Sequence, residues 1–266
     1  MISLPLFRVT VKSNYVIWLV FAAILAMYFS IISGMYDPEA IDAMEAMWDA
    51  LPPLLVETMS FSVVAPSLLG FLAGYYYGFL ILFFPMIYMV IMADRMIAKH
   101  VDNGSMAFLL ATPNSRVKIA LTQAAFLLGS MTLLIAFVAG IGILSSQAMF
   151  PGELELGGFI LLNVGAALLY FALSGIGFFA SCLFNQSKHS LALGGGLPVL
   201  FFVINLLANS GEQLSGLRYL TLLSLFDTAA IVNGGDYLSA FIALTFLGLA
   251  LYAAGIYVFS RKDLPL

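Results

Sequence analysis

Six long stretches of this sequence contain no charged residue, and each is long enough to cross a lipid bilayer as a helix. A bilayer core about 30 Å thick is spanned by about 20 helical residues. With 62% hydrophobic and 9% charged residues, the 266-residue chain has too little polar surface to form a soluble globule. We therefore predict an all-α polytopic membrane protein in which residues 1–266 form one transmembrane domain. The predicted spans cover approximately residues 14–35, 71–93, 119–144, 157–184, 190–209 and 237–259.

The charged residues are segregated between the two ends of these spans. With both termini in the cytoplasm, nine of the ten Lys and Arg residues lie inside, and eleven of the fourteen Asp and Glu residues lie outside. This agrees with the excess of Lys and Arg in cytoplasmic loops, and it leaves only Arg218 as an outer basic residue. The first span is expected to be an uncleaved signal anchor, because its apolar stretch is longer than that of a signal peptide. The sequence thus predicts a multi-pass protein of the plasma membrane with both termini inside.

Two shorter segments are predicted on the outer side. Residues 38–51 follow Asp37 and end before Pro52, and their apolar positions recur at helical spacing opposite an acidic face. We predict an amphipathic helix on the outer membrane surface, whose acidic face either attracts cationic substrates or is simply solvated. Residues 217–226 are apolar but too short to cross, which predicts a short interfacial or re-entrant helix after the fifth span.

The predicted spans contain no Asp, Glu, Lys, Arg or His. Ion-coupled transporters and intramembrane hydrolases use such groups inside the bilayer to bind a coupling ion or to activate a nucleophile. The sequence also has no Gly-x-x-x-x-Gly-Lys-Ser/Thr motif, and its single cysteine, Cys182, excludes an intrachain disulfide and a Cys-rich metal site. We therefore predict a non-catalytic chain that binds no metal or cofactor and is driven by another polypeptide.

The cytoplasmic loop between the second and third spans contains a short apolar segment. Residues 103–105 (Asn-Gly-Ser) are typical of a helix start and residues 112–113 (Thr-Pro) of a helix end, which predicts a helix over residues 104–112. The apolar face of this helix consists of Met106, Leu109 and Leu110. The face either docks into a groove of a soluble partner or lies back against lipid and the ends of the spans.

The same loop resembles a known signature. Residues 104–116 read GSMAFLLATPNSR, which is similar to the Gly-Thr-Leu-Glu-x-Leu-Leu-x-x-Pro-x-Ser-Arg sequence between the second and third spans of type-2 ATP-binding cassette (ABC) exporter permeases. The Phe226-Asp227 pair and the C-terminal FSRKDL of residues 259–264 also resemble this family, which closes with Phe-x-Arg-Arg-Asp-Leu. Among the positions that depart from the signature, Ser105 is a conservative replacement of Thr. Ala107 stands where an acidic residue is common, which removes a polar contact but not the docking, and Asn114 replaces a small apolar residue.

This resemblance implies that the chain is the transmembrane permease subunit of an ATP-driven exporter in a bacterial plasma membrane. Residues 104–112 would be a coupling helix that docks into a cytoplasmic ATPase subunit, which would bind the ATP and Mg²⁺. The implied contact residues are Gly104, Ser105, Leu109, Leu110, Pro113 and Arg116. The leucines would supply buried apolar area, the glycine and proline would limit the helix, and the arginine would pair with a carboxylate or a lipid phosphate.

The expected partners and substrates also follow from the resemblance. Two permease subunits, identical or related, would surround one pathway in contact with membrane lipids, and nucleic acid is not an expected partner. An apolar pathway suits peptide antibiotics, drugs or lipids, and resistance to antimicrobial peptides is our first expectation. Two alternatives from other classes are an autonomous channel or facilitator, and a membrane scaffold or sensor that moves no substrate.

Overall fold

The computed structural model describes residues 2–37, 67–209 and 212–264, and every regular element in these ranges is a helix. Six helical stretches are long and apolar enough to cross a membrane, which confirms the predicted all-α architecture with six candidate spans. They are α1 (Leu4–Gly34), the second span (Leu68–Met96), α8 (Arg116–Met149), α9 (Leu156–Leu183), α10 with α11 (Ser187–Ala208) and α13 (Leu238–Arg261). The second span is continuous and consists of α4 (Leu68–Leu72), the π-helix η1 (Ala73–Leu80) and α5 (Ile81–Met96). The amphipathic helix predicted over residues 38–51 lies outside the described residues.

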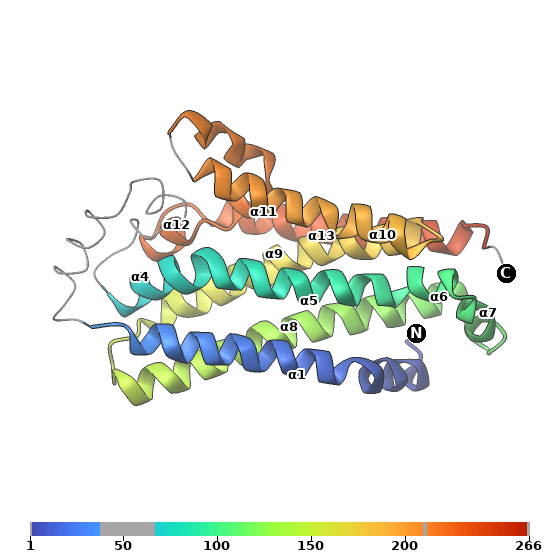
Figure 1. Ribbon diagram of the computed structural model, residues 1–266, viewed down its shortest axis with the longest axis horizontal. Helices are drawn as coiled ribbons and strands as arrows, with labels where there is room; N and C mark the ends of the chain where they lie inside the picture. The colour runs from blue at the N-terminus through green and yellow to red at the C-terminus, as the bar shows by residue number, and fades with distance from the viewer. Residues whose placement is uncertain (1, 38–66, 210–211, 265–266) are drawn as a thin grey trace.

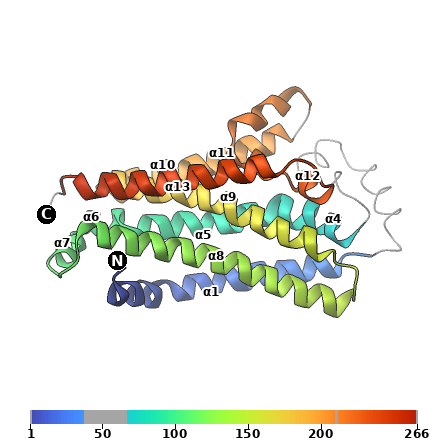
Figure 2. The same ribbon diagram turned by 180° about the vertical axis from the view of Figure 1, so that it is seen from behind.

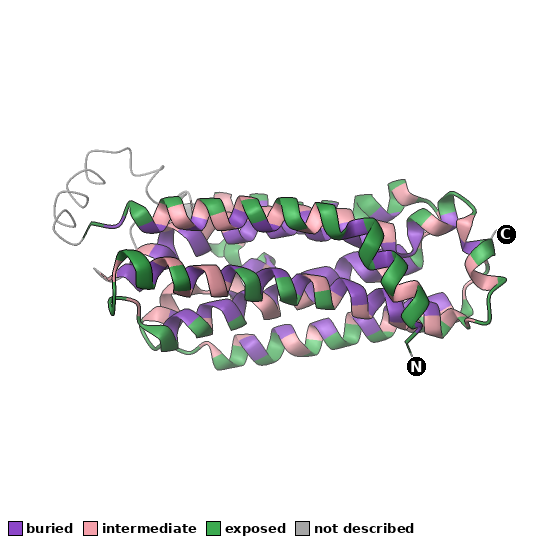
Figure 3. Ribbon diagram, turned by 90° about the horizontal axis from the view of Figure 1, so that it is seen from below, coloured by how far each residue is buried: buried purple, intermediate pink, exposed green. Residues whose placement is uncertain are grey.

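The spans run side by side along the long axis of the molecule (Figure 1). The most buried of them is α9, which packs against α13, α5, α8 and α10, and the view from behind shows α8 extended between α1 and α9 (Figure 2). Buried positions face the neighbouring helices, and exposed positions recur along the outer sides, as expected for helices whose outer faces meet lipid (Figure 3). The helices α6 (Ala98–Asp102) and α7 (Ser105–Leu110) lie at the same end as both termini (Figure 1).

The first span begins ten residues earlier than predicted, at Leu4 rather than residue 14. The prediction began this span after the charges of Arg8 and Lys12, but a helix begins where its backbone hydrogen-bond pattern begins, and Pro5 is well tolerated in a first turn. Arg8 and Lys12 are therefore exposed residues within α1. The α1 ribbon bends near its N-terminal end, so its first turns run at an angle to the rest (Figure 3).

The fifth span is divided into α10 (Ser187–Gly194) and α11 (Gly196–Ala208), which meet at Gly195. A side chain at this position would be crowded, because a Cβ atom on Gly195 would lie 2.7 Å from a methyl group of Val90 on α5. The break thus coincides with a close approach between α5 (Ile81–Met96) and the fifth span.

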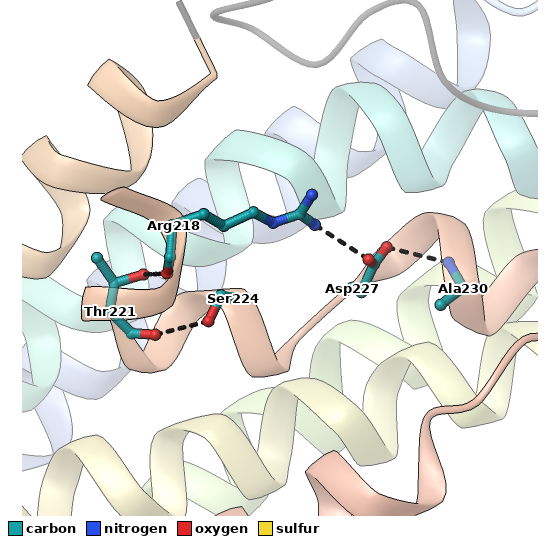
Figure 4. Close-up of polar contacts among 5 residues, drawn as sticks. All are labelled: Arg218, Thr221, Ser224, Asp227 and Ala230. Carbon is teal, nitrogen blue, oxygen red and sulfur yellow. Dashed lines mark hydrogen bonds and ion pairs between the residues drawn. The ribbon is translucent and has the colours of Figure 1, made fainter. Parts of the chain in front are cut away.

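The segment after the fifth span is made of short helical pieces, as Figure 4 shows in part. Where one short helix was predicted over residues 217–226, the chain forms the 3₁₀ helices η2 (Glu212–Leu220) and η3 (Leu222–Leu225), followed by α12 (Thr228–Val232). Asp227 caps α12 by accepting a hydrogen bond from the Ala230 amide at 3.0 Å, and its other oxygen lies 3.0 Å from Arg218 (Figure 4). Both side chains of this ion pair are largely exposed, so it orients the segment more than it stabilises the fold.

Candidate functional site

The α6–α7 loop is fastened to the bundle at the point where α5 ends. Ile97 has a non-helical backbone conformation, and this interrupts the helix between Met96 and Ala98. The hydroxyl of Ser181 on α9, which is fully buried, accepts hydrogen bonds from the Ile97 amide at 3.2 Å and the Ala98 amide at 2.9 Å. These two bonds satisfy amides that the interruption would otherwise leave unpaired. The loop is therefore connected directly to α9, the most buried span.

A tight turn starts α7. Gly104 has a φ of 74°, a left-handed conformation that costs a residue with a side chain about 1–2 kcal/mol. The side chain of Asn103 accepts hydrogen bonds from the Ser105 amide at 3.1 Å and from its hydroxyl at 2.7 Å. The same hydroxyl lies 2.8 Å from Nδ1 of His100 on α6. Burial lowers the pKa of His100, and the charge of Lys99 lowers it further, so its ring is neutral at neutral pH.

The six residues of α7 divide into an anchored face and an outward face. Met106 is fully buried, and Leu109 and Leu110 are half-buried against the same core. Phe108 points the other way, with 79% of its surface exposed. From the sequence, the two leucines could either dock into a partner or lie back against lipid and the ends of the spans. In the structure they lie mainly against the chain's own spans. Phe108 is the large apolar side chain that α7 presents outward.

The sequence reasoning missed Phe108, although the necessary signal was present. Positions three and four residues apart share a face of a helix, so placing Met106, Leu109 and Leu110 together puts Phe108 on the opposite face. Ser181 and His100 were also missed, because they act on the loop through contacts that no local spacing reveals.

The end of the loop is set by three polar side chains. The hydroxyl of Thr112 donates to the Leu109 carbonyl and accepts a hydrogen bond from the Asn114 amide group at 2.8 Å. Ser115 caps α8 by accepting from the Lys118 amide at 3.2 Å. Pro113 is exposed between them. The helix itself ends at Leu110, two residues before the predicted limit.

Arg116 contacts the C-terminal end of the chain. Its guanidinium donates a hydrogen bond to the Lys262 carbonyl, and the ammonium group of Lys262 donates to the Cys182 carbonyl at 3.0 Å. These bonds connect the start of α8, the end of α13 and the end of α9. Within the described residues Arg116 has no carboxylate partner, and its pairing with a carboxylate of another subunit or a lipid phosphate stays a prediction.

Gly104, Ser105, Leu109 and Leu110 therefore lie on or next to one helix. Pro113 lies in the segment that leads into α8, and Arg116 is the first residue of α8. No group of three or more His, Cys, Asp or Glu residues that could bind a metal occurs in the described ranges. The arrangement is an anchored helix with one protruding aromatic side chain, which is suited to contact with another macromolecule.

A comparison with known families matches residues 7–264 to the ABC-2 family transporter protein. The chain belongs to this family. The match covers nearly the whole chain, and together with the six apolar helices it identifies a multi-pass membrane protein of the permease type. The resemblance first found in the α7 segment is thereby confirmed. A comparison with curated proteins finds no match.

Proposed function

We propose that this ABC-2 family protein is the transmembrane permease subunit of an ATP-driven exporter, and that α7 docks into a separate cytoplasmic ATPase subunit. ATP and Mg²⁺ bind to that ATPase subunit, and two permease subunits surround the substrate pathway. The observation that carries the docking contact is the exposure of Phe108 on a helix that is otherwise anchored. An exposed aromatic side chain that enters a pocket of a partner is a common centre of binding energy.

The anchoring of α7 explains how a movement of the ATPase reaches the spans. Met106 ties α7 to the core, and Ser181 ties the preceding turn to α9, while α6 follows directly from α5. A displacement of Phe108 by its partner is therefore carried into α5 and α9 rather than absorbed by a flexible loop. Nucleotide can shift the equilibrium between the inward and outward states only if it binds the two states with different affinity. The rigid connection through α7 allows this difference in binding free energy to act on the spans.

The end of the bundle that carries the termini, α6 and α7 is the cytoplasmic end in this proposal. Of the basic residues, Arg8, Lys12, Arg95, Lys99, Arg116, Lys118, Lys188, Arg261 and Lys262 belong to this end in the predicted topology. For the substrate we propose an amphipathic or apolar molecule such as a peptide antibiotic, a drug or a lipid, because the spans offer it an apolar pathway. A bacterial plasma membrane is the proposed location.

The test is co-purification of the protein from its native membrane, with mass spectrometry of the bound proteins and an ATPase assay of the eluate. We expect an ABC ATPase subunit to be retained by the natural protein. Phe108→Ala should weaken this association by about 30-fold, the effect of losing a central aromatic contact worth roughly 2 kcal/mol. Phe246→Ala is the matched control, because Phe246 is 74% exposed but lies within α13.

Each of the other outcomes would show that a different part of the proposed function is wrong. If no ATPase co-purifies and reconstituted vesicles leak substrate without ATP, the protein is a channel or facilitator. If an ATPase binds but ATP drives no transport, the protein is a scaffold or sensor. If Phe108→Ala retains the ATPase as well as Phe246→Ala does, α7 is not the docking helix.

A further inference from the structure

A basic hollow lies between α1 and the end of the second span. It has a volume of about 280 Å³, and α1, α5, α6 and α7 contribute to its walls. Its polar lining includes Thr10, Ser13, Asn14, Arg95, Lys99 and His100. Among the residues that the structure describes, no Asp or Glu lines it, although Asp94 and Asp102 are close in sequence.

Neither Arg95 nor Lys99 forms an ion pair with a described carboxylate, although Asp94 is near enough to interact electrostatically with both. The guanidinium of Arg95 donates to the side-chain oxygen of Asn14 at 3.1 Å, which is a neutral partner. Lys99 is exposed, and the ion pair found in the described chain joins two residues at the other end of the bundle. Asp102 faces away, since it accepts a hydrogen bond from the Ser187 amide of α10 at 3.3 Å. Two basic side chains thus border a space that a single anionic group could occupy.

An apolar hollow of about 470 Å³ lies next to this site, between α1, α5 and α8. Asn14 borders both hollows, so they adjoin at this residue. The lining of the apolar hollow includes Phe7, Tyr15, Trp18, Tyr88, Phe126 and Gly129. The indole N–H of Trp18 is already satisfied, because it donates to the Ser130 carbonyl at 3.0 Å. What remains for a ligand is an almost purely apolar surface.

The two hollows have the spacing of a lipid headgroup and its chain. Tyr88 and Arg95 lie seven residues apart on α5, which places them about 10 Å apart along the helix. Along α1 the apolar hollow begins at Phe7, level with the basic hollow, and extends to Leu19, deeper in the bundle, where a helix that crosses a bilayer meets acyl chains. A soluble anion would use only the basic hollow, whereas a lipid uses both.

We propose that these two hollows bind one anionic phospholipid, with its phosphate between Arg95 and Lys99 and an acyl chain against Trp18. A zwitterionic phospholipid fits the apolar part equally well but brings no net charge to the basic part. Leu109 of α7 also lines the basic hollow, so the bound headgroup contacts the helix that we propose docks the ATPase. The lipid is then in a position to influence coupling.

The test uses Trp18 as the reporter. The chain contains two tryptophans, so Trp48→Phe leaves Trp18 as the only one. This variant is reconstituted without any ATPase into vesicles that contain either dibrominated phosphatidylglycerol or dibrominated phosphatidylcholine, whose bromine atoms quench a tryptophan on contact. We expect phosphatidylglycerol to reach half-maximal quenching at a lower mole fraction than phosphatidylcholine does. The ratio of the two mole fractions should be about fivefold for each basic residue in the site.

Variants of the two hollows separate the headgroup from the chain. Lys99→Gln and Arg95→Gln should each reduce the preference for the anionic lipid by about fivefold, whereas Arg261→Gln, at the same end on α13, should keep it. Gly129→Leu should prevent quenching by the anionic lipid, because a side chain there meets no other atom and fills the hollow. Gly140→Leu, an equally open position on α8, is its control.

Three results would overturn the proposal. One is equal quenching by the two lipids in the Trp48→Phe protein. Another is a preference that survives both Lys99→Gln and Arg95→Gln, which would indicate a general attraction to the charged surface. The third is a preference that survives Gly129→Leu, which would indicate an anion site without a place for the chain. None of these results depends on the proposed ATPase contact, because the permease is measured alone.

Discussion

The hydroxyl of Tyr170 lies 2.8 Å from the carbonyl oxygen of Ile81 and 2.6 Å from that of Leu82, so its one proton is shared between the two carbonyls. Pro85 stands four residues after Ile81 in the same helix and has no N–H group, so it cannot form the helical hydrogen bond to the Ile81 carbonyl. Tyr170 is on α9 and is almost fully buried. In a membrane, where water does not reach, a neighbouring helix must supply the missing donor, and here α9 does so for α5.

This relationship predicts the behaviour of a double-mutant cycle. Tyr170→Phe should lower the free energy of unfolding by about 1–2 kcal/mol, because it leaves the Ile81 carbonyl unpaired in the core. In a Pro85→Ala background the restored N–H group satisfies that carbonyl, so the same substitution should cost much less. Thermal unfolding of the four proteins in one detergent measures the coupling. Equal costs in the two backgrounds would show that the hydroxyl does not replace the missing donor.

Gly104 gives a second prediction. Gly104→Ala should make α7 open more readily by about 1–2 kcal/mol, because alanine is strained at the observed φ of 74°. Steric crowding is not the reason, since a Cβ atom at this position meets nothing within 4 Å. Gly104→Asn is the control, because asparagine tolerates this conformation and should retain most of the protection. Hydrogen exchange of the α7 amides provides the measurement, and equal protection in the two variants would contradict the assigned strain.

The lowered pKa of His100 predicts a local dependence on pH. In the unfolded loop His100 takes up a proton near its ordinary pKa of 6.5, whereas the folded loop resists protonation to a lower pH. The stabilisation is therefore complete above pH 6.5 and is lost as the pH falls through 6.5 towards the folded pKa. Hydrogen exchange of α7, corrected for the intrinsic effect of pH, should show more opening at about pH 5 than at about pH 7.

The other histidine of the chain supplies the control for this experiment. His189 is exposed, so His189→Asn should keep the response of α7 to pH. His100→Asn should remove it, because the titrating ring is then absent. A response that persists in His100→Asn would assign the opening to another group.

The contact between α9 and α13 gives a fourth prediction. A Cβ atom on Gly248 would lie 2.5 Å from the ring of Phe171, and that ring stacks on Tyr252 with a centroid distance of 5.7 Å. Gly248→Ala should therefore destabilise the protein by about 1–3 kcal/mol through overpacking. Gly140→Ala, where the added atom meets nothing within 4 Å, should not destabilise it. Thermal unfolding distinguishes them, and equal midpoints would mean that the two helices can separate without cost.

Local sequence patterns were enough to predict the helical spans, the segregation of charge between their ends and the short helix near residues 105–110. These features are local, because an uninterrupted apolar stretch must satisfy its own backbone in lipid, and turn residues limit a helix wherever it lies. Tertiary structure decided which side of each helix is used. Only packing showed that Leu109 and Leu110 face the core while Phe108 faces outward.

The same distinction explains the contacts that sequence reasoning did not find. Tyr170 reaches Ile81, Ser181 reaches Ala98 and Arg116 reaches Lys262 across more than 80 residues of chain in each case. Such pairs depend on the rotation and depth at which two helices meet, and the hydropathy of the sequence specifies neither of them. The hollows beside α1 have the same origin, since they are spaces left between three or more helices. The sequence therefore determined what crosses the membrane, and packing determined what the crossing helices present to lipid and partner.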